Sequence, residues 1–104
     1  MWTYRAKLNR VIDGDTIDLR IDLGFRVEMN VRVRLIGVNT PERGHPDWTT
    51  ATSTTRDWCE AVDADWPLRV STAKTEKYGR WLADVVDLNG RSLNQHLVKS
   101  GWGT

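Results

Sequence analysis

The sequence has a single cysteine, Cys59, among its 104 residues. One cysteine cannot form an internal disulfide framework, and it cannot supply the ligands of a cysteine-based zinc centre. Long apolar stretches are missing as well, because the longest covers only residues 35–38 and a membrane-spanning helix needs roughly 20. The first residues, MWTYR, lack the apolar segment of a secretory signal. We therefore expect neither a transmembrane protein nor a disulfide-stabilised one, and we expect a cytoplasmic location.

A surplus of either charge is also missing. Fifteen Lys and Arg residues stand against fourteen Asp and Glu residues, so the formal net charge is +1. A protein that coats duplex DNA without sequence preference normally carries a strong basic surplus. If nucleic acid is the partner, we therefore expect a small, local contact. The length fits one domain, residues 1–104, with a modest core.

Alternating apolar and polar residues predict strands in the first half of the chain. Residues 2–12 alternate in places, residues 17–23 alternate strictly, and residues 27–35 alternate again after Gly24. A period of two is typical of a strand with one buried face. The glycine between the second and third segments indicates a hairpin.

The pattern changes after the third strand. Residues 39–50 contain two prolines and a glycine, which predicts a loop. The spacing of the following residues predicts a helix over residues 51–64, with Trp58, Ala61 and Val62 on one face.

Two more strands and a second helix are expected in the remainder. Residues 68–72 and a segment starting at Leu82 have strand character, and Ser92 with Gln95 forms a capping box before a short helix. Five short strands with a helix inserted after the third fit a small Greek-key barrel of the OB type better than a sandwich. The fold class is therefore mainly β (α+β), and a parallel βαβ architecture is disfavoured because helices do not separate the strands.

The first polar cluster is Asp13-Gly14-Asp15-Thr16. Two carboxylates around a glycine turn can place hard oxygen ligands close together, as Ca²⁺ or Mg²⁺ requires. A solvated hairpin turn explains the same residues.

The second cluster runs from Arg34 to Glu42. The guanidinium of Arg34 matches a phosphate bidentately, and Asn39 and Thr40 offer carbonyl oxygens to a hard cation. Pro41 stiffens the turn that presents Glu42. An arginine paired with a surface carboxylate, beside an ordinary turn, is the alternative interpretation.

The third cluster is Lys77-Tyr78-Gly79-Arg80. It combines a second arginine with a phenol and with a glycine that lets backbone and ligand approach closely. A solvated loop explains this cluster equally well in isolation.

Taken together in this order, the clusters resemble the staphylococcal nuclease family. The similarity runs from about Leu8 to Trp102 and is poor between Gly44 and Pro67. It rests on residues 11–16 (VIDGDT), 33–42 (VRLIGVNTPE), 77–80 (KYGR) with Leu82 and Ala83, and 93–101 (LNQHLVKSG). The resemblance implies the family's five-stranded OB barrel and Ca²⁺-dependent hydrolysis of DNA or RNA that leaves 3′-phosphate ends.

The resemblance also implies a metal site. Asp15 matches the family's metal-binding aspartate. Asp13 would lie next to the metal ligands without binding the ion directly. Asn39 falls where the family usually has a second aspartate ligand, and Thr40 would supply a main-chain oxygen. An amide in place of that carboxylate removes one negative charge, so Ca²⁺ binding should be weaker.

Catalytic roles follow from the same resemblance. Glu42 matches the glutamate that activates the attacking water, and Arg34 and Arg80 match the two arginines that grip the phosphoryl oxygens. Lys77 and Tyr78 match residues that contact the neighbouring phosphate. The alternative function is a catalytically weak or inactive module that binds nucleic acid or a protein partner through the same barrel.

The family continues beyond the position of Thr104 through base-flanking tyrosines and a further helix that packs on the barrel. We therefore expect weaker base stacking, with Trp81 as the tryptophan of interest, and an exposed apolar surface. Such patches usually mark contacts, so a homodimer through Trp102 or the helix around Trp58 is expected. His45 and His96 are expected on the surface.

Overall fold

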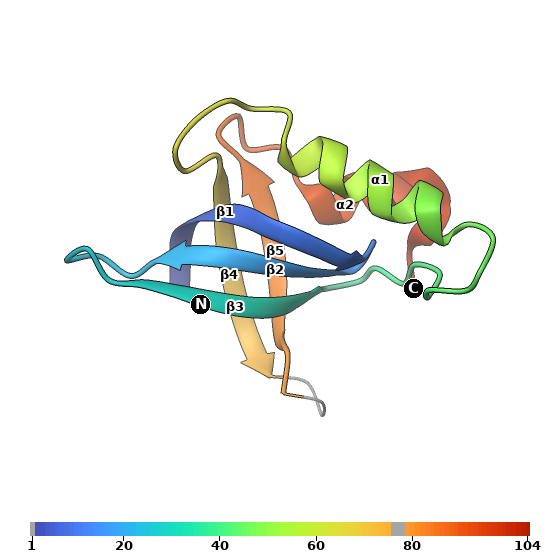
Figure 1. Ribbon diagram of the computed structural model, residues 1–104, viewed down its shortest axis with the longest axis horizontal. Helices are drawn as coiled ribbons and strands as arrows, with labels where there is room; N and C mark the ends of the chain where they lie inside the picture. Colours follow the sequence, from blue (N-terminus) through green and yellow to red (C-terminus); the bar gives the residue numbers. More distant parts are fainter. Residues whose placement is uncertain (1, 76–78) are drawn as a thin grey trace.

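The computed structural model describes the backbone of residues 2–75 and 79–104, and the side chains of residues 3–73 and 79–104. Figure 1 shows how its helices and strands follow one another. In chain order they are β1 (Trp2–Asp13), β2 (Thr16–Asp22), β3 (Glu28–Leu35), α1 (Trp48–Cys59), β4 (Leu68–Thr75), β5 (Trp81–Asp87), α2 (Leu93–Leu97) and the π-helical turn η1 (Val98–Trp102).

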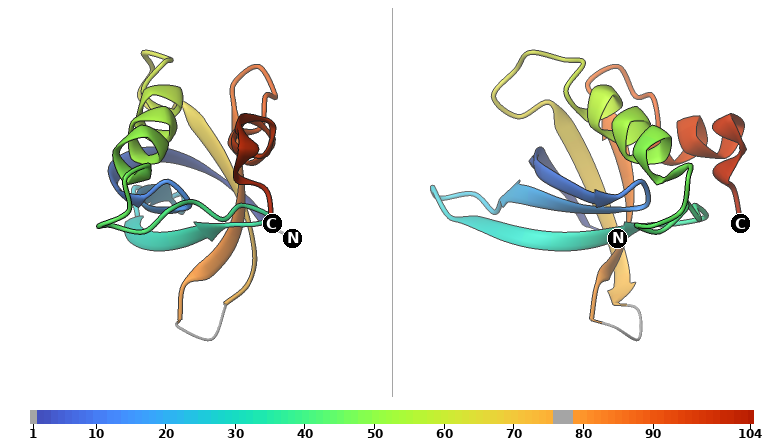
Figure 2. Two further views of the ribbon diagram at one scale, coloured as in Figure 1. Left: turned by 90° about the vertical axis from the view of Figure 1, so that its right-hand side faces the viewer. Right: turned by 45° about the vertical axis from the view of Figure 1, so that its right-hand side comes forward.

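The strands close into a barrel in the order β1-β2-β3-β5-β4, which confirms the predicted five-stranded architecture (Figure 2). β1 pairs antiparallel with β2 and also with β4, so this long strand has a hydrogen-bonded neighbour on each side. β3 and β5 run parallel in a short register from Val33–Trp81 to Leu35–Ala83. This parallel pairing brings the residue before β5, Arg80, to the end of β3 that carries Arg34.

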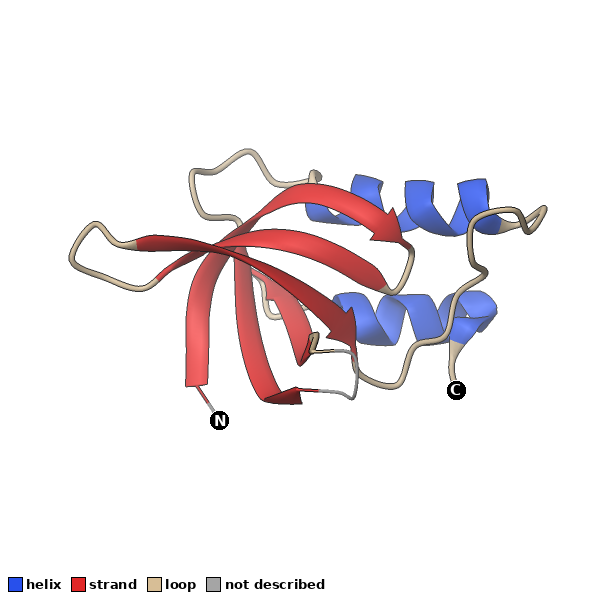
Figure 3. Ribbon diagram, turned by 60° about the horizontal axis from the view of Figure 1, so that its bottom comes forward, coloured by secondary structure: helices blue, strands red, loops and turns tan. Residues whose placement is uncertain are grey.

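The barrel interior is filled by the residues that alternate along the strands. Ile17, Leu19 and Ile21 of β2 are buried, while the intervening side chains are less so. Both helices lie at one end of the barrel (Figure 3), where they contribute Cys59, Leu93 and Leu97 to the same core. No helix in the described part of the chain is long and apolar enough to cross a membrane.

The prediction for the first helix was wrong in its bounds and in its buried face. α1 begins at Trp48 and ends at Cys59, so Ala61 and Val62 lie beyond it. Its buried residues are small or hydroxyl-bearing: Ala51, Thr52, Thr55 and Cys59. The reason is the close approach of the β1–β2 turn, because the Thr55 hydroxyl donates to the carbonyl of Gly14 at 2.7 Å.

The second helix starts where the capping box predicts, with the backbone N–H of Gln95 donating to Ser92 Oγ at 3.2 Å. A buried amide, Asn94, then fastens α2 to the barrel. Its Nδ2 donates to the carbonyls of Ile36 and Ala83 at 2.9 and 3.0 Å, and its Oδ1 accepts from the Val85 N–H at 3.1 Å. This amide fixes the helix against β5 and against the segment that follows β3.

The tryptophans expected at a dimer contact are partly buried. Trp58 and Trp102 pack against the barrel core, so part of each surface is already used within the chain. Four exposed large apolar residues lie instead along the β2–β3 hairpin, which projects away from the helices (Figure 1): they are Leu23, Phe25, Val27 and Met29. Ile36, Trp81, Leu88 and Val98 are exposed at other places on the surface. The homodimer stays a prediction.

Candidate functional site

Asp15 lies at the centre of the candidate site, in the turn between β1 and β2. Its side chain is buried and its two oxygens have different partners. Oδ1 accepts from the hydroxyl of Thr16 at 3.2 Å, and Oδ2 accepts from the backbone N–H of Thr40 at 3.2 Å. Nη1 of Arg34 also lies 3.2 Å from Oδ2. One carboxylate therefore joins the turn, the end of β3 and the loop that follows β3.

Gly14 allows this turn to pack closely. A Cβ atom at this position would lie 2.9 Å from both Cγ2 and Oγ1 of Thr40 and 3.1 Å from Cβ of Ala51. The neighbouring Asp13 is oriented by α1, because Nε1 of Trp48 donates to its Oδ1 at 2.8 Å. Position 14 thus requires a glycine because a Cβ atom has no room there. The hydrogen bond from Trp48 of α1 holds the turn in place.

The two arginines of the site are positioned by the parallel pairing of β3 and β5. Arg34 is half-buried, and its Nη1 also donates to the carbonyl of Val38 at 2.8 Å. Nη1 of Arg80 lies 3.3 Å from Oγ1 of Thr16. Besides the position of its backbone, a hydrogen bond from the side chain therefore holds each guanidinium close to the Asp15 turn.

The loop after β3 carries the remaining candidates. Asn39 is exposed, and its backbone N–H donates to the carbonyl of Trp102 at 2.8 Å. Thr40 is buried, and its Oγ1 has no hydrogen-bond partner among the described residues. Glu42 is exposed, and its carbonyl accepts from the N–H of His45 at 3.0 Å.

These residues meet in a pocket of about 310 Å³. It is lined by Asp13, Asp15, Arg34, Asn39, Thr40, Glu42 and Arg80. The structure thus brings together seven candidates from three separate parts of the sequence. Lys77 and Tyr78 lie outside the described residues. Trp81 is part of a different pocket, at the barrel mouth, beside Tyr4 and Met29.

The donor atoms of this pocket fit a hard divalent cation. Carboxylate, amide, hydroxyl and carbonyl oxygens are the ligands that Ca²⁺ and Mg²⁺ prefer, and the buried Thr40 Oγ1 lacks a partner in the described structure. The described residues contain no group of three or more His, Cys, Asp or Glu side chains placed to hold an ion. A cation in this pocket would therefore need the oxygens of Asn39 or Thr40 beside the carboxylate of Asp15.

Two supporting residues were missed from the sequence. The sequence predicts a loop at Trp48, whose indole orients Asp13. Thr16 belongs to the first polar cluster of the sequence without a role of its own, although its hydroxyl contacts Asp15 and Arg80. Nothing in the periodicity points to the indole. The contact between Thr16 and Arg80 depends on two pairings: β2 with β3, which sets Thr16 opposite Arg34, and β3 with β5, which sets Val33 opposite Trp81, the residue after Arg80. His45 and His96 are exposed, as expected.

Comparison with known proteins agrees with this geometry. The model of the family described as "Staphylococcal nuclease homologue" matches residues 32–104. Two proteins, each named "Uncharacterized endonuclease", from Escherichia coli O157:H7 and Escherichia coli, are 30% identical over 98 residues, which is 92% of this chain and 57% of their own length. Endonuclease YhcR of Bacillus subtilis (strain 168) is 28% identical over 109 aligned positions, covering 95% of this chain and 9% of that protein. The chain spans about half the length of the first two relatives.

Proposed function

Because the chain belongs to the staphylococcal nuclease homologue family, we propose that it hydrolyses phosphodiester bonds of DNA or RNA with a divalent cation, Ca²⁺ being the first candidate. The observation that carries the proposal is the convergence of Asp15, Arg34, Glu42 and Arg80 on one pocket. Two guanidinium groups and two carboxylates in a small polar cavity suit the hydrolysis of a phosphodiester bond. Residues 1–104 are taken as one domain for this activity.

The two arginines are proposed to stabilise the transition state. In-line displacement at phosphorus builds negative charge on the equatorial oxygens, and fixed guanidinium donors stabilise that charge. Arg34 and Arg80 suit this role because hydrogen bonds to Val38 and Thr16 hold them in place. Lys77 and Tyr78 are proposed to contact the neighbouring phosphate.

Glu42 is proposed to orient and deprotonate the attacking water. Its side chain is exposed at the edge of the pocket, so solvent reaches it directly. A carboxylate within hydrogen-bond reach of a water molecule can accept its proton as the bond to phosphorus forms. The proton passes to solvent as the water oxygen bonds to phosphorus. The P–O5′ bond breaks, the 5′ oxygen takes up a proton from solvent, and the other fragment keeps a 3′-phosphate end.

Asp15, Asn39 and Thr40 are proposed to hold the cation. Asp13 is proposed to lie next to these ligands without binding the cation directly. A bound Ca²⁺ would act as a Lewis acid on the phosphoryl oxygen. Asp15 must exchange its contact with Arg34 for this role, which frees the guanidinium to meet a phosphate instead. Asn39 contributes an oxygen without a charge, so Asp15 is the negatively charged member of these three proposed ligands.

A second candidate function is binding without efficient catalysis. It is favoured by one observation: the carboxylate of Asp15 is already satisfied by Thr16, Arg34 and Thr40. A cation has to compete with these contacts, and residue 39 gives it only a neutral amide. A site that fails this competition would still present arginines to a phosphate backbone.

A panel of substrates and metals separates the two candidates. Single-stranded and duplex DNA and RNA are each incubated with Ca²⁺, Mg²⁺, Mn²⁺ or chelator, and the product ends are identified by mass spectrometry. Cleavage that needs a divalent cation and leaves 3′-phosphates supports the nuclease. Binding without cleavage under every metal supports the second candidate.

A further inference from the structure

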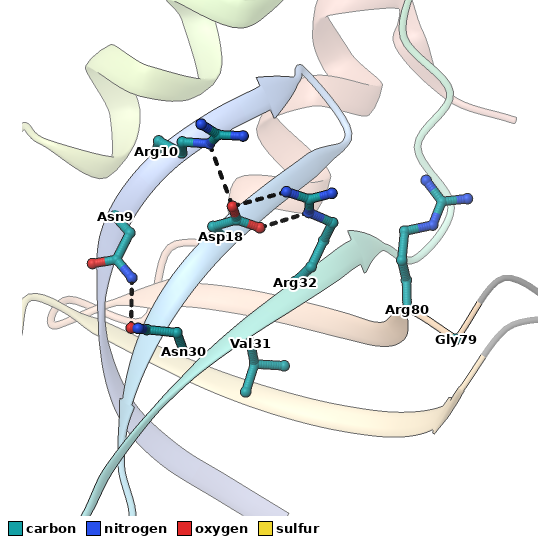
Figure 4. Close-up of a pocket in the computed structure, with 8 residues that line it drawn as sticks. All are labelled: Asn9, Arg10, Asp18, Asn30, Val31, Arg32, Gly79 and Arg80. Atoms are coloured by element: carbon teal, nitrogen blue, oxygen red, sulfur yellow. Dashed lines mark hydrogen bonds and ion pairs between the residues drawn. The ribbon is translucent and has the colours of Figure 1, made fainter.

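A second groove lies on the outer face of β1, β2 and β3, next to the candidate active site (Figure 4). It encloses about 700 Å³ and is lined by Asn9, Arg10, Asp18, Asn30, Val31, Arg32, Gly79 and Arg80. We refer to these eight residues as the outer-sheet groove. None of the roles derived above uses Arg10, Asp18 or Arg32, so the groove calls for a separate explanation.

Charge is concentrated in this groove. Three arginines and one aspartate line it, which gives a local charge of +2 in a chain whose net charge is +1. Asp18 lies between two of the arginines: its oxygens are 2.8 and 3.1 Å from Nε and Nη2 of Arg32, and 3.5 Å from Nε of Arg10. Outside the groove the sequence holds twelve Lys and Arg residues and thirteen Asp and Glu residues, so the groove is a local positive site.

The shared aspartate orients the arginines without covering them. Arg32 offers one edge of its guanidinium to Asp18, so its Nη1 edge faces away from that carboxylate. The side chains of Arg10 and Arg32 remain 68% and 47% exposed. In the view of Figure 4, Arg32 lies between Arg10 and Arg80. An oriented and accessible guanidinium is suited to an anionic ligand.

The groove is continuous with the candidate active site. Arg80 lines both the outer-sheet groove and the pocket around Asp15. Arg10 lines the groove and also a third hollow, which includes Asp13 and Glu42 of the active site. A ligand that reaches Arg80 from the groove therefore arrives at the proposed reaction centre without leaving polar surface.

We propose that the outer-sheet groove binds the phosphate backbone of a single-stranded nucleic acid, on the nucleotides adjacent to the bond that is cut. This inference rests on the proposed nuclease function and adds a path for the strand. Arg80 contacts the scissile phosphate at one end, and Arg32 and Arg10 contact the next phosphates along the chain. The Asn9–Asn30 amide pair, joined at 2.8 Å, gives neutral hydrogen-bonding groups at the far end.

A single strand fits the groove better than the alternatives. A duplex-coating surface needs an extended basic track, whereas the outer-sheet groove is a small positive region in a chain whose net charge is +1. Single strands are bound on barrels of this type by a positively charged groove that follows the backbone. A protein partner with an acidic segment would match the same charge, but it would have no reason to enter at Arg80.

The inference is tested by binding of a fluorescein-labelled ten-nucleotide DNA strand, followed by anisotropy in chelator so that the strand stays intact. Arg10→Ala and Arg32→Ala should each weaken binding by roughly tenfold. Each should also reduce the slope of log K against log salt concentration by about 0.7. The matched control is Arg20→Ala, because Arg20 is also an ion-paired arginine on β2, 3.5 Å from Glu28, outside the groove.

A second pair of variants works in the opposite direction. Asp18→Asn removes the negative charge between the two arginines but keeps a carbonyl oxygen that can accept from Arg32, so it should preserve the orientation of Arg32 and tighten binding of the strand severalfold. Glu28→Gln is its control, since it removes the partner of Arg20 and leaves the groove charge unchanged. Equal effects for all arginine variants, or no tightening with Asp18→Asn, would overturn the proposal that the groove binds the strand. Binding would then reflect only the general charge of the protein.

Cleavage separates this inference from the function on which it rests. The ratio of kcat/KM for the ten-nucleotide strand to kcat/KM for a dinucleotide should fall in Arg10→Ala and Arg32→Ala and stay unchanged in Arg20→Ala. An unchanged ratio in an active enzyme refutes the groove alone. If the wild type cleaves neither substrate under any metal, the proposed function fails, and the anisotropy result still decides whether the groove binds a strand.

Discussion

Replacing Arg34 by alanine is expected to separate cation binding from catalysis. Nη1 of Arg34 lies 3.2 Å from Oδ2 of Asp15, and the two side chains are only 23% and 9% exposed. A cation that binds Asp15 competes with this guanidinium for the same carboxylate. Removing the guanidinium should therefore tighten Ca²⁺ binding, while turnover falls because one of the two groups that stabilise the phosphoryl oxygens is gone.

The magnitude follows from the distance between the charges. Two unit charges 3.2 Å apart attract by about 1 kcal/mol in water and by about 5 kcal/mol at an effective dielectric constant of about 20. Because Arg34 is partly exposed, screening reduces the competing attraction to roughly 1–3 kcal/mol. That range corresponds to a Kd for Ca²⁺ that is lower by a factor of roughly 5 to 150 in Arg34→Ala. Turnover should fall by about 10²–10³.

Calorimetric titration of Ca²⁺ into the wild type, Arg34→Ala and Arg34→Lys tests this reasoning. The lysine variant keeps the charge, so its Kd should stay near that of the wild type, while its turnover should fall because an ammonium lacks the planar fork. Loss of the 2.8 Å hydrogen bond to the Val38 carbonyl should cost the alanine variant about 1 kcal/mol of folding stability. A Kd for Ca²⁺ that is equal or higher in Arg34→Ala would refute the competition.

Three further outcomes are expected. Asn39→Asp adds a carboxylate to the site and should lower the Kd for Ca²⁺ in the same titration; no change would mean that residue 39 does not face the ion. Gly14→Ala places a Cβ 2.9 Å from Cγ2 and Oγ1 of Thr40 and should lower the free energy of unfolding in urea by about 1–3 kcal/mol; wild-type stability would contradict the close approach. Burial raises the pKa of the Cys59 thiol to about 12, so iodoacetamide at pH 8 should modify it only after unfolding, and rapid labelling of the folded protein would show that the residue is accessible.

The strands were predictable because one side of each faces a single core. Ile17, Leu19 and Ile21 alternate with polar residues, and a period of two has only one interpretation when half of the side chains are buried. The five-stranded barrel was also predictable, since five short strands without separating helices fit few architectures. The structure confirms both.

The first helix was less predictable because its buried face has few large apolar residues. Thr52 and Thr55 occupy positions that a periodicity argument assigns to Leu or Val, and Thr55 is buried because its hydroxyl has the Gly14 carbonyl as a partner. Such a contact depends on an element 41 positions earlier in the chain. Local spacing cannot show it.

The sequence could predict which residues form the candidate site, but it could not predict the contacts between them. Asp15, Arg34, Glu42 and Arg80 stand in motif blocks whose order resembles a known family, and the structure brings all four to one pocket. The ion pair between Asp15 and Arg34 and the Trp48–Asp13 hydrogen bond arise from tertiary packing.

The most direct test of the central claim is the rate at which wild type and Arg80→Ala cut single-stranded DNA in Ca²⁺, each measured again after addition of chelator. Arg80 is held by Thr16 at the edge of the pocket, so the variant keeps the cation ligands and loses one guanidinium. We predict cleavage by the wild type in Ca²⁺ alone, a rate about 10²–10³ lower in Arg80→Ala, and no cleavage by either protein in chelator. Cleavage that survives chelation, or that is undiminished in Arg80→Ala, would contradict a cation- and arginine-dependent nuclease.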